Sequence, residues 1–225
     1  MGTFHGTVRP VKPRALLLDL DGTIADTLPV CISAVRATLA HHTGRVLSDD
    51  ELLALFRYNE EEVLRRAAPD CWQACVPTYL EEYERAHGLC PAPFPGLVDL
   101  VRALRSRGVA LGLVTGKGRD TLAISFRRLG LTGLFDEVRM GSPAPEAKAL
   151  WIGEIMRAFQ VGGDHAAYLG DFPADIQAAR SNGIWALAAA WSSAARIEAL
   201  LRENPDVLFH SVPEFAEWVE RWLEE

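Results

Sequence analysis

The sequence predicts an α/β fold in which a parallel sheet is covered by helices on both faces. Short apolar runs typical of buried strands recur along the chain, at 15–18, 109–114, 166–169 and 184–189. From residue 97 onward these runs alternate with helical segments, which is the pattern of a parallel sheet with both faces buried. Between the first run and residue 97, only helical periodicity is found. We therefore expect an all-helical insertion after the first strand.

The first strand, 15–18, is followed by Asp19-Leu-Asp21-Gly22-Thr23. Two carboxylates two residues apart face the same side of an extended chain, and a glycine after them permits a sharp turn. Carboxylates at the carboxyl end of a strand are suited to hold a hard cation, and one of them is placed to act as a nucleophile. An acidic turn without chemistry explains Asp-x-Asp alone about equally well.

The helical insertion begins directly after this turn. Ser48 and Glu51 have the spacing of a capping box, and Pro77 marks a kink or a helix start. A Pro- and Gly-rich linker, 88–95, ends the insertion. We expect helices at 28–42, from 51, at 60–68 and, as one helix or a pair, at 71–87. The predicted domains are a helical cap, 28–92, and a core formed by 1–27 and 93–225.

The second half of the chain supplies the remaining core elements. Glycines end the helices that precede the strands, as expected of helix C-caps. In open parallel sheets, ligands bind beyond the carboxyl ends of the strands, so residues that follow a strand are candidate site residues. We expect helices at 97–107, 120–129, 148–159 and 175–181, and strands at 109–114, 137–140, 166–169 and 184–189.

The composition excludes several classes of function. The chain has 225 residues, 49% of them hydrophobic, with a net charge of −7 and a pI near 5.4. An acidic chain argues against nucleic-acid binding, and no apolar run is long enough to span a bilayer. Residues 1–14 lack the apolar region of a signal peptide, and the four cysteines fit neither a redox pair nor a zinc site. We expect a cytoplasmic protein, as a monomer or homodimer.

Two later segments place polar groups directly after strands. Thr115 and Gly116 follow the strand at 109–114, where a hydroxyl and a free backbone N–H can bind a phosphate oxygen, although such turns are common in any protein. Asp171 and Asp175 follow the strand at 166–169 at positions i and i+4, so both can face one point and hold Mg²⁺. Helix capping is the alternative role for these two aspartates.

The string Asp19-Leu-Asp21-Gly22-Thr23-Ile24-Ala25-Asp26 resembles the first motif of the haloacid dehalogenase superfamily, in its phosphoglycolate-phosphatase-like branch. Gly170-Asp171-x-x-x-Asp175 resembles the fourth motif, and the resemblance extends from 15 to about 223. It implies a Rossmann-like core with a small helical cap. It also implies roles for individual residues: Asp19 as nucleophile, Asp21 as general acid/base, Thr115 and Gly116 as phosphate-binding residues, and Asp19, Asp21, Asp171 and Asp175 as the Mg²⁺ site.

One motif of the family is altered. The family's lysine usually stands in Lys-Pro-x-Pro, but here Ser142 occupies that position before Pro143 and Pro145. The chain has only three lysines, Lys12, Lys117 and Lys148, and Lys148 opens the following helix, close to where the family lysine normally lies. A cation is needed there because several carboxylates and a phosphate would otherwise repel one another. The resemblance therefore assigns the role to Lys148, with a surface lysine as the alternative.

Substrate recognition is less defined. Arg57 lies between two cap helices, where the family carries its specificity loop, and an arginine can pair with a second anionic group. A solvated loop arginine is an equally good explanation. The role of Lys117 is open, and we expect His41, His42 and His87 to be surface residues without a role.

The resemblance implies Mg²⁺-dependent hydrolysis of a small phosphate monoester, phosphoglycolate-like or a sugar phosphate, through an aspartyl-phosphate. Asp21 argues against a haloacid dehalogenase, and a cap without lysine argues against a phosphonoacetaldehyde hydrolase. A phosphosugar mutase shares the core motifs and remains an alternative. A phosphate-binding or interaction protein without catalysis is another, favoured by the displaced lysine.

Overall fold

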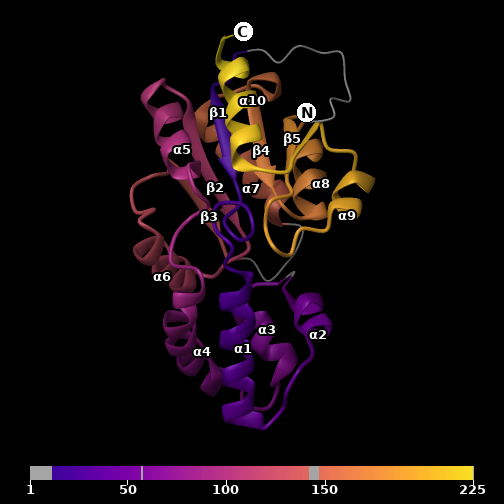
Figure 1. Cartoon of the computed structure of the whole chain (residues 1–225). Helices are drawn as coiled ribbons and strands as arrows, with labels where there is room; N and C mark the ends of the chain where they lie inside the picture. Colours follow the sequence, from indigo (N-terminus) through magenta and orange to yellow (C-terminus); the bar gives the residue numbers. More distant parts are fainter. Residues whose placement is uncertain (1–11, 57, 142–146, 225) are drawn as a thin grey trace.

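The computed structural model describes residues 12–56, 58–141 and 147–224. Its centre is a six-stranded parallel sheet with the order β3-β2-β1-β4-β5-β6 (Figure 1), so the predicted α/β class is confirmed. The sheet includes one strand, β6, in a stretch where the sequence analysis predicts no element. The strands are β1 (Ala15–Leu18), β2 (Ala110–Thr115), β3 (Glu137–Met140), β4 (Ala166–Gly170), β5 (Trp185–Ala189) and β6 (Val207–Phe209).

The central strand β1 is buried on both faces because its apolar side chains alternate between two cores. Leu16 and Leu18 belong to one core and Leu17 to the other. Helices α5 (Leu97–Ser106), α6 (Arg119–Leu129) and α10 (Val212–Glu224) pack into the core of Leu16 and Leu18. Helices α7 (Ala147–Phe159), α8 (Pro173–Ser181) and α9 (Ile197–Arg202) pack into the core of Leu17. This is the predicted arrangement of a sheet between two helical layers.

Four helices lie between β1 and α5 and form a separate group at one end of the sheet (Figure 1). They are α1 (Leu28–Thr43), α2 (Asp49–Leu55), α3 (Glu60–Ala67) and α4 (Trp72–Ala86), followed by the short 3₁₀ turn His87–Leu89. The capping box of Ser48 and Glu51 is present at α2. Helix α4 runs through Pro77 as a single helix. The exact domain boundaries stay a prediction.

The histidine expected at the surface near the end of this group is buried, which corrects the sequence prediction. His87 is 3% exposed, and its ring nitrogens lie 3.2 Å from Ser125 Oγ and 3.3 Å from the carbonyl oxygen of Cys90. Its hydrogen-bond partners come from α6 and from the segment after the 3₁₀ turn, which the local sequence does not reveal.

The carboxyl ends of β1, β2, β4 and β5 meet at the edge of the sheet that faces the four-helix group (Figure 1). Since β1 lies between β2 and β4, residues that follow these three strands converge. Within the described ranges, no helix has the length and apolarity needed to cross a bilayer.

Candidate active site

The turn after β1 brings Asp19 against the end of β4. The backbone N–H of Asp19 donates to the carbonyl of Leu169 at 2.9 Å, and Asp19 is 5% exposed. Gly22 has a φ of +73°, which L-residues avoid. A Cβ at Gly22 would lie 2.0 Å from Oδ2 of Asp171, closer than any real contact. The predicted turn therefore requires glycine for its conformation and for the close approach of Asp171.

Lys148 lies in the first turn of α7 and joins two carboxylates. Its Nζ lies 2.9 Å from Oδ2 of Asp19 and 2.6 Å from Oδ1 of Asp175. Asp175 is fully buried and also accepts hydrogen bonds from the hydroxyl of Tyr168 (3.2 Å) and the backbone N–H of Phe172 (3.0 Å). Burial lowers the pKa of Lys148, but Asp175 and Asp19 outweigh it and hold that pKa well above its usual value. The two carboxylates therefore favour the charged form of this lysine.

Three carboxylates of this edge form a compact cluster. One oxygen each of Asp19, Asp171 and Asp175 lies within 4.8 Å of the others. Burial raises the pKa of Asp19, Lys148 lowers it, and Asp175 and Asp21 raise it further. The resulting pKa of Asp19 is about 7. Burial and the neighbouring carboxylates also raise the pKa of Asp171 well above its usual value. When they are ionised, the three carboxylates carry more negative charge than Lys148 alone compensates.

These residues fit a divalent cation with oxygen ligands. Oδ1 of Asp19 is buried and has no hydrogen-bond partner among the described residues. Asp171 accepts one hydrogen bond from the described residues, from Thr23 Oγ1 at 3.2 Å to Oδ1. A hard cation such as Mg²⁺ takes carboxylate oxygens of this kind and keeps other positions for water and phosphate.

Asp21 lies outside this cluster and faces the four-helix group. Its Oδ1 accepts from the hydroxyl of Thr27 and lies 3.0 Å from Nζ of Lys117. No described residue makes a hydrogen bond to its Oδ2, and its side chain is 30% exposed. One carboxylate oxygen of Asp21 is thus held in place, while the other is open.

Lys117, whose role the sequence left open, is buried between the sheet and the helical group. Its Nζ lies 3.8 Å from Oε1 of Glu60, 3.6 Å from Sγ of Cys31 and 4.7 Å from the ring centre of Tyr83. Burial lowers its pKa, but Asp21, Cys31, Tyr83 and Glu60 raise it well above the usual value. Lys117 therefore links Asp21 to side chains of α1, α3 and α4.

Glu60, the first residue of α3, makes a contact that sequence reasoning missed. Its Oε2 accepts from the backbone N–H of Gly118 at 2.6 Å, and its Oε1 from the hydroxyl of Thr121 at 2.5 Å. Both donors belong to the start of α6. A glutamate at a helix start is ordinary in sequence, so nothing local signals that it joins the two parts of the chain.

The predicted phosphate-binding residues lie at the end of β2. Thr115 is fully buried, and its Oγ1 accepts from the backbone N–H of Lys117 at 3.2 Å. No described residue accepts a hydrogen bond from its hydroxyl, so the proton is available to another acceptor. Gly116 lines the cavity described next. Arg57, the predicted substrate contact, and Ser142 lie outside the described residues.

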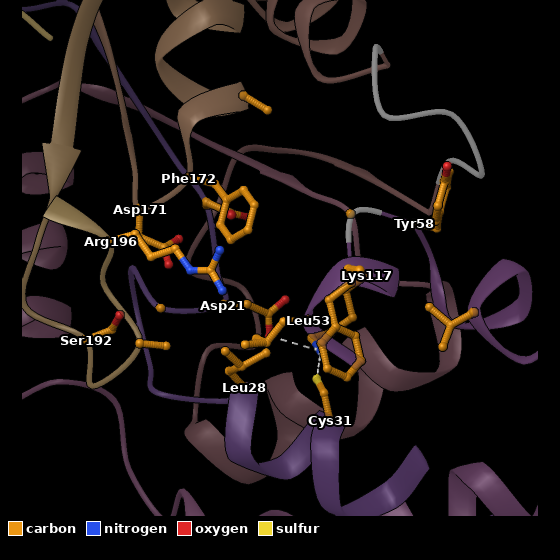
Figure 2. A pocket seen from close by; sticks show the side chains of 18 of the residues that line it. Asp21, Leu28, Cys31, Leu53, Tyr58, Lys117, Asp171, Phe172, Ser192 and Arg196 are labelled. Atoms are coloured by element: carbon orange, nitrogen blue, oxygen red, sulfur yellow. Dashed lines mark hydrogen bonds and ion pairs between the residues drawn. The ribbon is translucent and has the colours of Figure 1, made fainter. Parts of the chain in front are cut away.

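A cavity of about 680 Å³ opens between the sheet edge and the helical group (Figure 2). It brings together predicted residues from distant parts of the chain with apolar side chains of α1 and α2. Ser192 and Arg196, from the loop after β5, line it as well, and no sequence signal marked them. The predicted residues in its wall are Asp19, Asp21, Gly116, Lys148 and Asp171.

Comparison with known proteins places the chain among hydrolases. Residues 16–189 match the sequence model of the haloacid dehalogenase-like hydrolase family. A phosphoglycolate phosphatase of Synechococcus elongatus is 30% identical over 203 residues, which cover 88% of this chain and 93% of that protein. The pyrophosphatase PpaX of Bacillus pumilus is 28% identical over 201 residues, 86% of this chain and 90% of that protein.

A solved structure supports the fold. CbbY from Rhodobacter sphaeroides, in complex with phosphate, superposes with a TM-score of 0.77 and 19% identity over 95% of this chain and all of its own (100%). At this identity, the similarity concerns the fold alone.

Proposed function

This chain belongs to the haloacid dehalogenase-like hydrolase family as a phosphoric monoester hydrolase, and we propose that it is a Mg²⁺-dependent phosphatase. Its substrate is a small phosphate monoester, either phosphoglycolate-like or a sugar phosphate. The reaction proceeds through an aspartyl-phosphate on Asp19.

One observation carries this proposal: Lys148 joins Asp19 and Asp175 at the edge of the sheet where Asp171 also lies. A nucleophilic carboxylate must approach a negatively charged phosphoryl group, and the repulsion has to be compensated by fixed positive charge. Lys148 supplies such charge 2.9 Å from Asp19. The alternative role of Lys148 as a surface lysine has no support, since its side chain is only 16% exposed.

The two carboxylates after β1, Asp19 and Asp21, have different roles in the reaction. In the first step, an oxygen of Asp19 forms a bond to phosphorus while the bond from phosphorus to the ester oxygen breaks, and Asp21 gives a proton to the leaving alcohol. In the second step, Asp21 takes a proton from a water molecule that attacks phosphorus. The bond to Asp19 then breaks, which releases inorganic phosphate and restores the carboxylate.

The remaining residues hold the phosphoryl group and the cation. Asp19 and Asp171 have oxygens available as Mg²⁺ ligands. Asp175 orients Lys148 by accepting a hydrogen bond from its Nζ. Mg²⁺, when bound, neutralises charge on the transferred group. The hydroxyl of Thr115 and the backbone of Gly116 bind a phosphate oxygen. We assign Asp21 to proton transfer, because Lys117 and Thr27 hold its Oδ1 in place while its Oδ2 is open.

The experiment is phosphate release from a panel of phosphate esters, with Mg²⁺ or with EDTA, by wild type and Asp19→Asn. We expect release that requires Mg²⁺ and is lost in Asp19→Asn. Activity that survives this substitution would exclude Asp19 as nucleophile. An isomeric product instead of free phosphate would indicate a phosphosugar mutase, and binding without turnover a non-catalytic protein. Pyrophosphate belongs in the panel because of the relative named PpaX.

A further inference from the structure

The loop after β5 contributes two polar side chains to the cavity that holds Asp19 and Lys148. Ser192 and Arg196 both line this cavity. The guanidinium of Arg196 projects into it, toward Asp21 (Figure 2). Because β5 ends at the same edge of the sheet as β1 and β4, this loop approaches the reaction site from the core and not from the helical group.

Arg196 differs in one respect from the other cations of the cavity. Among the residues that the structure describes, three cationic side chains line it: Lys117, Lys148 and Arg196. Lys148 is occupied by two carboxylates and Lys117 by Asp21 and Glu60. The side chain of Arg196 makes no ion pair or hydrogen bond with any described residue. Its charge is therefore available to a ligand.

Ser192 supplies an independent indication. The residue is 8% exposed, and its Oγ has no hydrogen-bond partner within the described part of the chain. Buried hydroxyls are nearly always hydrogen-bonded, so an orphaned one in a cavity wall points to a missing partner. A hydroxyl and an arginine fork on one loop together match an anionic group with several acceptor oxygens.

We propose that Ser192 and Arg196 bind a second anionic group, a carboxylate or a phosphate, on the alcohol part of the substrate. This inference rests on the proposed phosphatase function and names the class of ester. The transferred phosphoryl group already has Lys148, Thr115 and the cation site. The described cap side chains in the cavity are apolar, acidic or uncharged. Among the described residues, Arg196 is therefore the cation available to compensate a second anion.

The test uses three phosphate esters with the same two-carbon skeleton. Phosphoglycolate and ethanediol bisphosphate carry a second anionic group and are called the charged esters. In 2-hydroxyethyl phosphate the second group is a neutral hydroxyl, and this compound is called the uncharged ester. Arg196→Gln should lower kcat/KM at least about tenfold, mainly through KM, for one or both charged esters, and less than about twofold for the uncharged ester. Arg196→Lys should restore part of the loss, and Ser192→Ala should show the same selectivity with a smaller effect. The ester that responds more identifies the second anion as carboxylate or phosphate.

Arg202→Gln is the matched control. Arg202 lies on α9 outside the cavity, its side chain is 75% exposed, and its one ion pair among the described residues is with Glu198. This variant removes the same charge nearby and should leave all three esters unchanged. An equal loss for every ester in Arg196→Gln would place Arg196 on the transferred phosphoryl group and overturn the proposal. No loss for any ester would overturn it as well.

A binding measurement separates this inference from the proposed function. Calorimetry in the Asp19→Asn background, with Mg²⁺, measures the affinity for the three esters without turnover. If wild type releases no phosphate from any ester, the phosphatase proposal fails, while a preference for the charged esters that depends on Arg196 still supports the second anion site. Equal affinity for charged and uncharged esters would refute that site even in an active phosphatase.

Discussion

Nζ of Lys148 lies 2.9 Å from Oδ2 of Asp19, although the two residues are 129 positions apart in the sequence. The lysine comes from the start of α7 and the aspartate from the end of β1, and Asp175 at the start of α8 completes the contact at 2.6 Å. This three-residue arrangement makes the carboxylates, the lysine and the cation site depend on one another.

Lys148→Ala should lower kcat by about 10²–10³-fold, because a preorganised charge-stabilising group is removed. It should also destabilise the fold by about 3–5 kcal/mol, since Asp19 and Asp175 lose the buried partner of an ion pair. Lys148→Arg should keep most of the stability. Steady-state kinetics and denaturant unfolding measure the two effects, and Lys12→Ala is the control. Full activity in folded Lys148→Ala would exclude the role of this lysine.

The raised pKa of Asp19 predicts a pH dependence of stability in EDTA. Its pKa rises from 3.8 to about 7 on folding, so the folded state holds a proton that the unfolded state releases. Stability relative to Asp19→Asn should therefore fall as the pH rises from about 4 to about 7, by up to about 4 kcal/mol. Urea unfolding at several pH values measures this difference. A pH-independent difference between the two proteins would contradict the raised pKa.

Gly22 and Gly44 form a matched pair for testing the cation site. Both have positive φ, +73° and +66°, so alanine at either position costs about 1–2 kcal/mol of backbone strain. Only at Gly22 would the added Cβ meet Asp171, at 2.0 Å from Oδ2, whereas nothing lies within 4 Å at Gly44. Gly22→Ala should therefore abolish the increase in Tm on adding Mg²⁺, while Gly44→Ala retains it. Equal Mg²⁺ responses in the two variants would show that Asp171 is not a ligand.

Glu60 should hold α3 against the start of α6. Glu60→Ala removes the acceptor of the Gly118 amide, and hydrogen bonds to a charged group contribute about 1.5–3 kcal/mol. We expect hydrogen exchange of the Gly118 amide to become at least about tenfold faster and KM to rise. Glu61→Ala, at an exposed neighbour, is the control. Unchanged protection of Gly118 in Glu60→Ala would show that this contact does not limit opening.

The sequence identified features that depend on local chemistry. The apolar runs predicted four of the six strands, because a strand buried between helical layers must be continuously hydrophobic. The strand at 137–140 was also predicted, although its residues alternate between charged and apolar. Gly22 predicted the turn after β1, and Ser48 with Glu51 predicted the start of α2. The C-terminal elements α9, β6 and α10 were not predicted. The strand β6 has only three residues, too few for a periodic signal.

The sequence also identified the candidate site residues, because carboxylates, threonine and glycine follow strands whose carboxyl ends lie at one edge of the sheet. It could not tell which charges pair across that edge. Lys117 follows β2 and Lys148 lies in the first turn of α7, yet Lys148 contacts Asp19 and Lys117 contacts Asp21. Pairing of this kind depends on how α7 and the helical group pack on the sheet, and only the tertiary structure decides it.

The same reason explains the residues that sequence reasoning missed. Glu60, Ser192 and Arg196 belong to ordinary helix starts and loops, and their residue types carry no signal by themselves. Their significance comes from what lies opposite: the start of α6 for Glu60, and the shared cavity for Ser192 and Arg196. The amino-acid sequence alone determined the fold class and the carboxylates after β1 and β4. The partners of those carboxylates and the wall of the cavity were decided by packing between segments far apart in the chain.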